Sequence, residues 1–486
     1  MDKGSFIGIN FGTTNTSVVQ LLNDEQGIRC INLGEEGEYP FSSVVAIPKN
    51  KGALKFGREV RNHREQLSSE YEIFTSMKTY LGTDKEFIIG SKRYSATDIT
   101  SEFLKSIKEY IVRVHGIEIK EAGFSFPVNF TPEARRELRV AAERARISVK
   151  SFVAESTAAY FSTRKYGQAY SKVMVLDWGG GTFDISILEL KKNSVSEISI
   201  FGEQVGGDDI DIELAKHVHA EIVKKAGKGW NTSFDDMDSA SRDLLVARCE
   251  RAKIEISETD DDYDLTVYGY GEYGTKSLTL SIEWFYGIVE PIIRSRILKA
   301  IDIALGKANL TPIGIEAVVI VGGSSNLTSY EKAIMHVFAD ADIILPDKPQ
   351  WSTAEGAALM QIIGGNFKLN DSLGVFLSDG SVFPIFKASN DGVGSKIEAI
   401  TFSLTEDAKD AHFIFTNGDG STIFERVNIP TKGFLYEQIT LSAEIEEDQI
   451  ARVRIHNPSM GNLKSNPELQ VDINQLTFHY DISEID

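Results

Sequence analysis

Two segments of this chain repeat one pattern: an apolar strand, a glycine turn that carries threonine, and a second strand. The first occupies residues 8–16 (GINFGTTNT) and the second residues 176–184 (LDWGGGTFD). A glycine turn lets backbone N–H groups approach a phosphate without interference from a Cβ. Threonine hydroxyls add donors and water-mediated contacts to a metal. Two such hairpins can hold a polyphosphate and its Mg²⁺ between them, so the repeat indicates nucleotide chemistry.

Length, charge and cysteine content narrow the class of protein. A chain of 486 residues is long enough for about two to four domains. Its net charge of −20 disfavours binding to nucleic acid or to an anionic membrane, since both are polyanions. Cys30 and Cys249 have no neighbours at metal-ligand spacing, and we find no signal-like segment and no apolar run that could span a bilayer. We therefore expect a cytoplasmic protein with reduced thiols.

The expected elements divide the chain into two regions and a linker. Residues 1–365 alternate strands with helices, which predicts an α/β domain. Residues 372–486 contain short strands separated by turns, which predicts an all-β sandwich with no helical segment after the strands. Residues 366–371 form a short linker between them. Within the α/β domain we expect helices at residues 101–114, 133–146, 243–257, 282–305 and 352–363.

An ordered set of motifs resembles the DnaK-type chaperones, the seventy-kilodalton heat-shock family. The two hairpins resemble the phosphate-binding segments of that family. The further matches, in order, are residues 76–78 (SMK), 154–159 (AESTAA), 206–209 (GGDD), 249–257 (CERAKIEIS) and 319–324 (VIVGGS). The resemblance implies an actin-like fold, in which two lobes built on ribonuclease-H-type sheets bind ATP between them. The glycine repeat alone leaves a sugar kinase or an actin open.

The resemblance also implies a role for each residue of the nucleotide site. The phosphates of ATP or ADP would contact Gly12, Thr13, Thr14, Asn15, Gly179, Gly180, Gly181 and Thr182. Gly206 and Gly207 would also contact the nucleotide. Mg²⁺ would be bound through water by Asn10, Glu155 and Asp177. Lys78 would orient the attacking water beside the γ-phosphate, and Asp184 would polarise that water. The nucleoside would contact Glu250, Lys253, Ser257, Gly322, Gly323 and Ser324.

The residues by themselves leave simpler interpretations open. Lys78 fits an ordinary surface lysine, and Glu250 with Lys253 fits an ion pair within one helix. Ser257 fits a residue at the C-terminal end of that helix. Pro127 and Arg135 resemble the switch proline of the family and the arginine that senses its state, but they also fit a loop proline and a solvated arginine.

The β-domain resembles the peptide-binding domain of the family. Val375, Phe402, His412 and Ile414 fall at positions like those of the peptide pocket, which implies an extended polypeptide client, with J-domain and exchange-factor partners. His412 falls at the central position, where burial of an imidazole costs free energy unless it is hydrogen-bonded. A structural histidine is the alternative. Exposed edge strands of the sandwich would allow two chains to form a dimer.

Several positions depart from the family pattern. Asn10 stands where the family has an aspartate, and the lost negative charge beside Mg²⁺ predicts slower hydrolysis. Ser156 replaces a proline, and Ser151 replaces an arginine that meets J-domain partners. The linker is short, with Phe367 and Leu369 as its apolar groups, so coupling between the domains is weak unless other contacts provide it. Two functions follow: a slow ATP-hydrolysing chaperone without a lid, or a nucleotide-binding adaptor with one dedicated partner. A metabolic kinase of the same superfold is a third.

Overall fold

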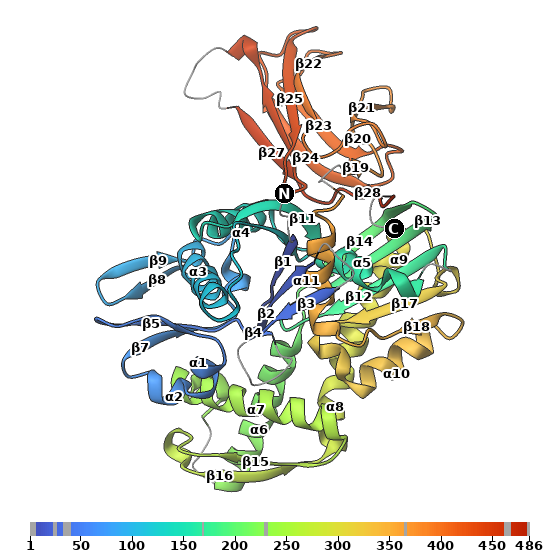
Figure 1. Cartoon of the computed structure of the whole chain (residues 1–486). Coiled ribbons are helices and arrows are strands. Elements are labelled where there is room, and N and C mark those ends of the chain that lie inside the picture. Colours follow the sequence, from blue (N-terminus) through green and yellow to red (C-terminus); the bar gives the residue numbers. More distant parts are fainter. Residues whose placement is uncertain are drawn as a thin grey trace.

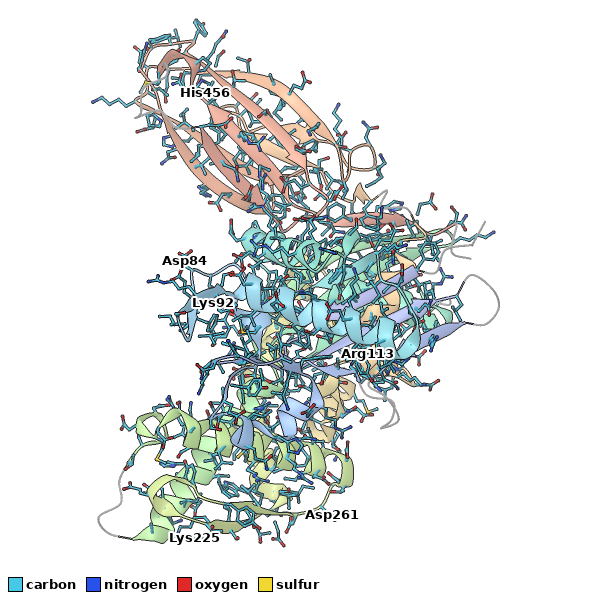
Figure 2. The ribbon with its side chains drawn as sticks, turned by 60° about the vertical axis from the view of Figure 1, so that its left-hand side comes forward. Asp84, Lys92, Arg113, Lys225, Asp261 and His456 are labelled. Atoms are coloured by element: carbon cyan, nitrogen blue, oxygen red, sulfur yellow. The ribbon has the colours of Figure 1, made fainter. Side chains whose placement is uncertain are left out.

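The structure is a computed structural model that describes residues 6–22, 27–32, 40–167, 170–227, 232–363, 367–460 and 468–483. The predicted boundary between the α/β domain and the linker, at residues 365 and 366, lies outside the described residues. Figure 1 shows two α/β lobes with a β-sandwich above them. In the turned view of Figure 2, His456 lies toward the far end of the sandwich, whereas Lys225 and Asp261 lie at the opposite end of the molecule.

The first lobe is built on a sheet in the order β11-β10-β1-β2-β3, with β4 paired to β2. Its strands are β1 (Phe6–Phe11), β2 (Asn15–Leu21), β3 (Ile28–Ile31), β4 (Phe41–Ser42), β10 (Glu121–Phe126) and β11 (Ser148–Ala154). Strand β1 runs antiparallel to β2 and parallel to β10. The smaller elements of this lobe are β5 (Val45–Pro48), β6 (Lys55–Phe56), β7 (Tyr71–Phe74), β8 (Glu86–Ile89), β9 (Lys92–Ser95), α1 (Arg58–Asn62) and α2 (Arg64–Leu67).

Helices α3 (Ala96–His115) and α4 (Pro132–Arg144) cover this sheet, as the helical spacing predicts. Ser95 caps α3 by accepting a hydrogen bond from the Asp98 N–H at 3.1 Å. Thr131 caps α4 by accepting one from the Ala134 N–H at 3.2 Å, directly before Pro132. Such caps satisfy N–H groups that have no partner inside the helix, which explains why both helices begin where they do.

The second lobe is built on a sheet in the order β18-β17-β12-β13-β14-β28-β19. Its strands are β12 (Lys172–Trp178), β13 (Phe183–Lys191), β14 (Ser194–Glu203), β17 (Ala317–Val321), β18 (Asp342–Ile344), β19 (Lys368–Leu369) and β28 (Phe478–Asp481). The remaining elements of this lobe are α6 (Gly207–Ala226), α7 (Ser239–Thr259), α8 (Ile282–Ile292), α9 (Leu298–Lys307), α10 (Thr328–Val337), β15 (Tyr263–Val267) and β16 (Lys276–Leu280).

Two helices lie between the sheets of the two lobes. Helix α5 (Glu155–Gly167) packs against α11 (Pro349–Leu359), and α11 also packs against β1 and β2 of the first lobe (Figure 1). Each lobe thus contributes a glycine hairpin from a sheet that borders this helix pair. The fold places the two hairpins opposite each other, although they are far apart in the sequence.

The β-domain is a sandwich of two antiparallel sheets, as predicted. One has the order β21-β20-β23-β24 and the other β22-β25-β26-β27. Their strands are β20 (Leu373–Phe376), β21 (Val382–Phe386), β22 (Lys396–Ser403), β23 (Asp410–Asn417), β24 (Ile423–Pro430), β25 (Gln438–Ile445), β26 (Ala451–His456) and β27 (Leu469–Ile473). Buried side chains alternate along β25 and β26, so one face of each strand forms the core between the sheets.

The last described strand does not belong to the sandwich, in contrast to the predicted domain of residues 372–486. Strand β28 pairs with β14 of the second lobe and with β19, which lies in the predicted linker. Residues before and after the sandwich therefore extend the sheet of the second lobe (Figure 1). Among the described residues, we find no helix whose length and apolar character would let it traverse a bilayer.

Candidate functional site

The two glycine hairpins meet at their turns. A Cβ atom on Gly180 would lie 1.9 Å from the Thr14 Oγ1, and one on Gly181 would lie 2.8 Å from the Thr13 Oγ1. Any larger residue at these two positions would therefore clash with the threonines of the other lobe. The structure brings together the residues that the sequence predicted to hold phosphates from both sides.

Hydrogen bonds to carbonyl groups hold each turn in place. In the first hairpin, Ser43 donates its N–H to the Thr14 carbonyl at 2.8 Å and its hydroxyl to the Gly12 carbonyl at 2.7 Å. In the second, the Gly179 carbonyl accepts from the Gly207 N–H at 3.1 Å and from the Ser324 hydroxyl at 2.8 Å. The Gly179 N–H in turn donates to the Thr182 carbonyl at 2.9 Å, which closes the second turn.

A buried charged cluster lies beside the hairpins. Lys78, which is 2% exposed and so is not a surface lysine, forms an ion pair with Glu155 at the start of α5. Asp177 lies one residue before the end of β12, next to the second turn, and accepts a hydrogen bond from the Thr353 hydroxyl at 3.1 Å. Asp184 on β13 accepts the Val128 N–H at 2.6 Å. One lysine thus lies among three acidic side chains, which leaves negative charge uncompensated.

Burial and mutual repulsion change the protonation of these carboxyl groups. Burial, followed by the negative charge of Glu155, raises the pKa of Asp177 to about 7. Burial, followed by the charges of Glu155 and Asp177, raises the pKa of Asp184 well above its ordinary value. The buried Asp184 Oδ2 has no hydrogen-bond partner. A hydrated cation would satisfy that oxygen and relieve the repulsion, so the residues fit Mg²⁺.

The resemblance implies metal contacts that act through water, and the residues named for them lie as follows. Among the described residues, no three His, Cys, Asp or Glu side chains form a group suited to direct metal binding. Asn10 lies on β1, where its Oδ1 accepts a hydrogen bond from the Ser125 hydroxyl at 3.1 Å. Thr182 is buried beside Asp184. Asn15 begins β2 and is exposed.

The residues predicted to bind the nucleoside lie near one another but have other partners. Lys253 donates to the Asp211 Oδ2 at 2.7 Å and to the Gly207 carbonyl at 2.9 Å. Glu250 forms an ion pair with Arg61 of the first lobe. Glu250 and Lys253 therefore each pair with a residue outside α7. The Ser257 hydroxyl bonds to the Lys253 carbonyl at 2.6 Å, as expected of a residue near a helix end.

Two acidic residues of this region, Asp208 and Asp211, had no predicted role, although Asp208 belongs to the motif at residues 206–209. Asp208 accepts hydrogen bonds from the Ser76 hydroxyl at 2.9 Å and the Thr14 hydroxyl at 3.2 Å, both in the first lobe. Burial raises the pKa of Asp211 to about 7 although Lys253 opposes the shift. The two residues are three positions apart and follow directly after Gly207, so they lie on one side of α6. This spacing is the sequence pattern from which their proximity could have been predicted.

The loop that begins at Pro127 connects the charged cluster to the β-domain. Its Val128 N–H bonds to Asp184, and its Phe130 ring centroid lies 5.7 Å from the Lys78 Nζ. On the other side, the Phe130 carbonyl accepts a hydrogen bond from the Asn474 side chain at 2.8 Å. The loop thus touches both domains.

Arg135 is buried against the β-domain rather than solvated. Its guanidinium stacks 4.0 Å from the Phe126 ring centroid and donates to the carbonyls of Asp448, Gln449 and Asn474 at 3.3, 3.4 and 3.0 Å. Burial lowers the pKa of Arg135 to about 9, which leaves it protonated at neutral pH.

Two neighbouring arginines of α4 add ion pairs to this contact. Arg136 pairs with Asp472, and Arg139 pairs with Glu447 and Asp448. Helix α4 therefore presents three arginines to acidic side chains and carbonyls of the sandwich.

The four residues predicted to line a peptide pocket do not share one face. Val375 is buried between the sheets. Phe402 also points to this inner side, since its ring centroid lies 5.5 Å from that of the buried Phe413. His412 and Ile414 alternate with inward-facing residues of β23 and so point to the other side. The expected burial of His412 does not occur, because this side of the strand is exposed; its Nδ1 lies 2.6 Å from the Asn428 Oδ1.

Comparison with known proteins places the chain in a family. A model of the family described as Hsp70 protein matches residues 55–410. The chaperone protein DnaK of Thermotoga petrophila is 30% identical over 371 residues, which cover 74% of this chain and 60% of the relative. DnaK of Metamycoplasma hominis is 30% identical over 343 residues, with 69% and 55% covered.

DnaK of Mycoplasmopsis agalactiae is 28% identical over 341 residues, which cover 69% of this chain and 54% of the relative. The chain thus spans little more than half the length of these relatives. Because the family model matches most of the chain, and an actin-like ATPase domain with a β-sandwich is the architecture of that family, the chain belongs to the Hsp70 family.

Proposed function

We propose that this chain binds ATP with Mg²⁺ between its two glycine hairpins, hydrolyses it slowly, and couples the nucleotide state to the binding of extended polypeptide by the β-domain. The observation that carries the proposal is the buried cluster of Lys78, Glu155, Asp177 and Asp184 next to hairpins that meet turn to turn. A polyphosphate with a bound metal ion complements such a cluster, because the lysine attracts the phosphates and the carboxylates attract the metal.

Each group has a task in this proposal. Backbone N–H groups of the hairpin turns would bind the phosphates, and Mg²⁺, when bound, would supply positive charge that neutralises them. Lys78 places a positive charge beside the transferred phosphoryl group, as a loose transition state requires. The unpartnered Asp184 Oδ2 holds and orients the attacking water. Glu155 and Asp177 orient the water shell of the metal.

Coupling between the domains follows the Pro127 loop in this proposal. Movement of Asp184 on phosphate release would pull on the Val128 N–H, and the loop carries that movement to Asn474 and to the Arg135 contact. A change in nucleotide state then alters the docking of the sandwich, because the two states differ in these contacts.

A nucleotide-binding adaptor with little ATPase activity is the second candidate. The observation that favours it is Asn10, a neutral side chain whose Oδ1 already accepts a hydrogen bond from Ser125. With less negative charge at that position, the metal is less well ordered and hydrolysis is slower. The adaptor would recognise one partner instead of many apolar peptides.

Single-turnover ATP hydrolysis with Mg²⁺ separates the candidates. The wild type is compared with Lys78→Ala and with the control Lys216→Ala, which changes an exposed lysine on α6. A measurable rate that falls at least tenfold in Lys78→Ala alone supports the ATPase. Tight ATP binding without hydrolysis in any variant supports the adaptor, and no ATP binding by the folded wild type refutes both. Circular dichroism must show that Lys78→Ala is folded, because the substitution leaves Glu155 buried without its partner.

A further inference from the structure

Strand β28 is the structural link between the second lobe and the β-domain. It pairs in antiparallel register with β14, where Val195 faces Tyr480. On its other side it pairs with β19, where Leu369 faces Phe478. Strand β28 therefore lies between β14 and β19, so the position directly beside β14 in the sheet is taken by a segment that follows the sandwich. The predicted linker touches β14 directly through Asn370, whose side chain donates to the Glu197 carbonyl at 2.7 Å.

A buried carboxylate holds this strand. Glu197 on β14 is 1% exposed and accepts hydrogen bonds from the Phe478 N–H at 2.9 Å, the Tyr480 hydroxyl at 2.9 Å and the Thr157 hydroxyl at 2.6 Å. Arg135 contributes further attraction. A buried carboxylate needs such donors, so removal of β28 would leave Glu197 with two fewer.

The same carboxylate is connected to the nucleotide cleft. The Thr157 hydroxyl lies 2.9 Å from the Ser186 hydroxyl, which lies 2.7 Å from the hydroxyl of Ser156. All three hydroxyl-bearing side chains are fully buried. Ser156 directly follows Glu155, the partner of Lys78, at the start of α5. A continuous series of hydrogen bonds therefore joins Tyr480 to the residue next to the buried ion pair.

Packing strengthens the attachment of β28. Tyr480 is completely buried, with its ring centroid 5.6 Å from that of Phe161 on α5 and 5.1 Å from that of Phe367 in the predicted linker. One side chain thus contacts β14 through its hydroxyl, and α5 and the linker through its ring. Displacement of β28 would expose this ring and unpair its hydroxyl at the same time.

We propose that Glu197 is a positioning residue that transmits the docking of β28 to the ATPase site through Thr157, Ser186 and Ser156. Docked β28 fixes the first turn of α5 and with it the direction of Glu155. Conversely, a nucleotide-dependent shift of Glu155 changes how firmly β28 is held, since coupling is reciprocal. Strand β28 thereby carries an interdomain signal that the short linker alone does not. This inference rests on the proposed ATPase function.

The first test uses Tyr480→Phe, which removes only the hydroxyl, with Tyr436→Phe as control at an exposed tyrosine of the sandwich. Hydrogen exchange is measured at residues 194–203 and 478–481 of the full chain, with and without ATP and Mg²⁺. Loss of one buried hydrogen bond to a charged group should speed exchange in these segments by roughly tenfold or more. In the wild type, we expect ATP with Mg²⁺ to change the exchange of residues 478–481.

The second test uses Ser156→Ala, a mild change at the end of the connection nearest Glu155, with Ser162→Ala as control on the same helix. The Ser162 hydroxyl bonds only within α5, to the Ala159 carbonyl. Ser156→Ala should change the single-turnover rate by at least threefold and abolish the ATP-dependent change in exchange at residues 478–481. Ser162→Ala should change neither.

The outcomes distinguish this inference from the proposed function. If the wild type binds ATP but Tyr480→Phe and Ser156→Ala behave like their controls, the role of Glu197 and β28 is refuted and the ATPase stands. If the folded wild type does not bind ATP, the ATPase and the coupling fail together. If Tyr480→Phe differs from its control in hydrogen exchange, and Ser156→Ala differs from its control in the single-turnover rate and in the ATP-dependent exchange, the inference is supported.

Discussion

Replacing Asp177 with asparagine should stabilise the nucleotide-free protein while weakening its response to ATP and Mg²⁺. Burial and the nearby Glu155 raise the pKa of Asp177 from 3.8 to about 7. Because this folded-state pKa lies above the unfolded value, the folded protein binds the proton more tightly. Below about pH 4 the carboxyl group is protonated in both states and does not lower the free energy of unfolding. As the pH rises from about 4 to about 7, the group lowers that free energy progressively.

The magnitude follows from that pKa difference. At about 1.4 kcal/mol per pKa unit, the rise from 3.8 to about 7 corresponds to an upper limit of about 4 kcal/mol at neutral pH. Asparagine still accepts the Thr353 hydrogen bond, but attraction to Lys78 is lost and water solvates part of the site. We therefore expect Asp177→Asn to raise the free energy of unfolding by about 1–3 kcal/mol at pH 8, by roughly a third of that at pH 5, and by nearly nothing below about pH 4.

Thermal unfolding at pH 5 and pH 8, with and without ATP and Mg²⁺, measures both effects. The control is Asp340→Asn, at an exposed aspartate, which should leave the unfolding temperature unchanged. Asp177→Asn should unfold at a higher temperature than the wild type at pH 8 and should gain less from ATP with Mg²⁺. A variant that is less stable at pH 8, or whose difference from the wild type is the same at both pH values, would contradict the electrostatic reasoning.

Two further substitutions test the site and the interface. Asn10→Asp restores a negative charge to the metal region and should speed single-turnover hydrolysis at saturating Mg²⁺, whereas an unchanged rate would show that Asn10 does not limit the reaction. Arg135→Met removes the donors to Asp448 and Asn474 but keeps apolar contact with Phe126, and should destabilise the docked β-domain by about 2–4 kcal/mol. Limited proteolysis should detect easier separation of the domains, and equal cleavage of variant and wild type would refute the role of Arg135.

Local patterns explain why much of the architecture could be predicted. The Thr131-Pro132 cap fixes the start of α4 through a hydrogen bond between residues three apart. The second glycine hairpin pairs Trp178 directly with Phe183 across its turn. Such features depend on neighbours in the sequence and on the different periods of helices and strands. For this reason the α/β region, the sandwich and the two glycine hairpins could be predicted from the sequence.

The peptide pocket was predicted less well because strand register decides which face a residue occupies. A resemblance in sequence placed Val375 and His412 together, but their strands put them on opposite faces of one sheet. Because side chains alternate along a strand, a shift of one residue moves a side chain from the core to the solvent. Neither composition nor motif spacing determines this register.

By itself the sequence determined the division into an α/β region and a sandwich, and it carried the resemblance that the family match confirmed. Only the tertiary structure decided that Arg135 is buried, that Asp208 joins the lobes, and that Glu197 meets Tyr480, 283 residues later in the chain. The physical reason is that turns and caps form among neighbours, whereas burial of a charge or pairing of a strand edge depends on which distant segments the fold brings together.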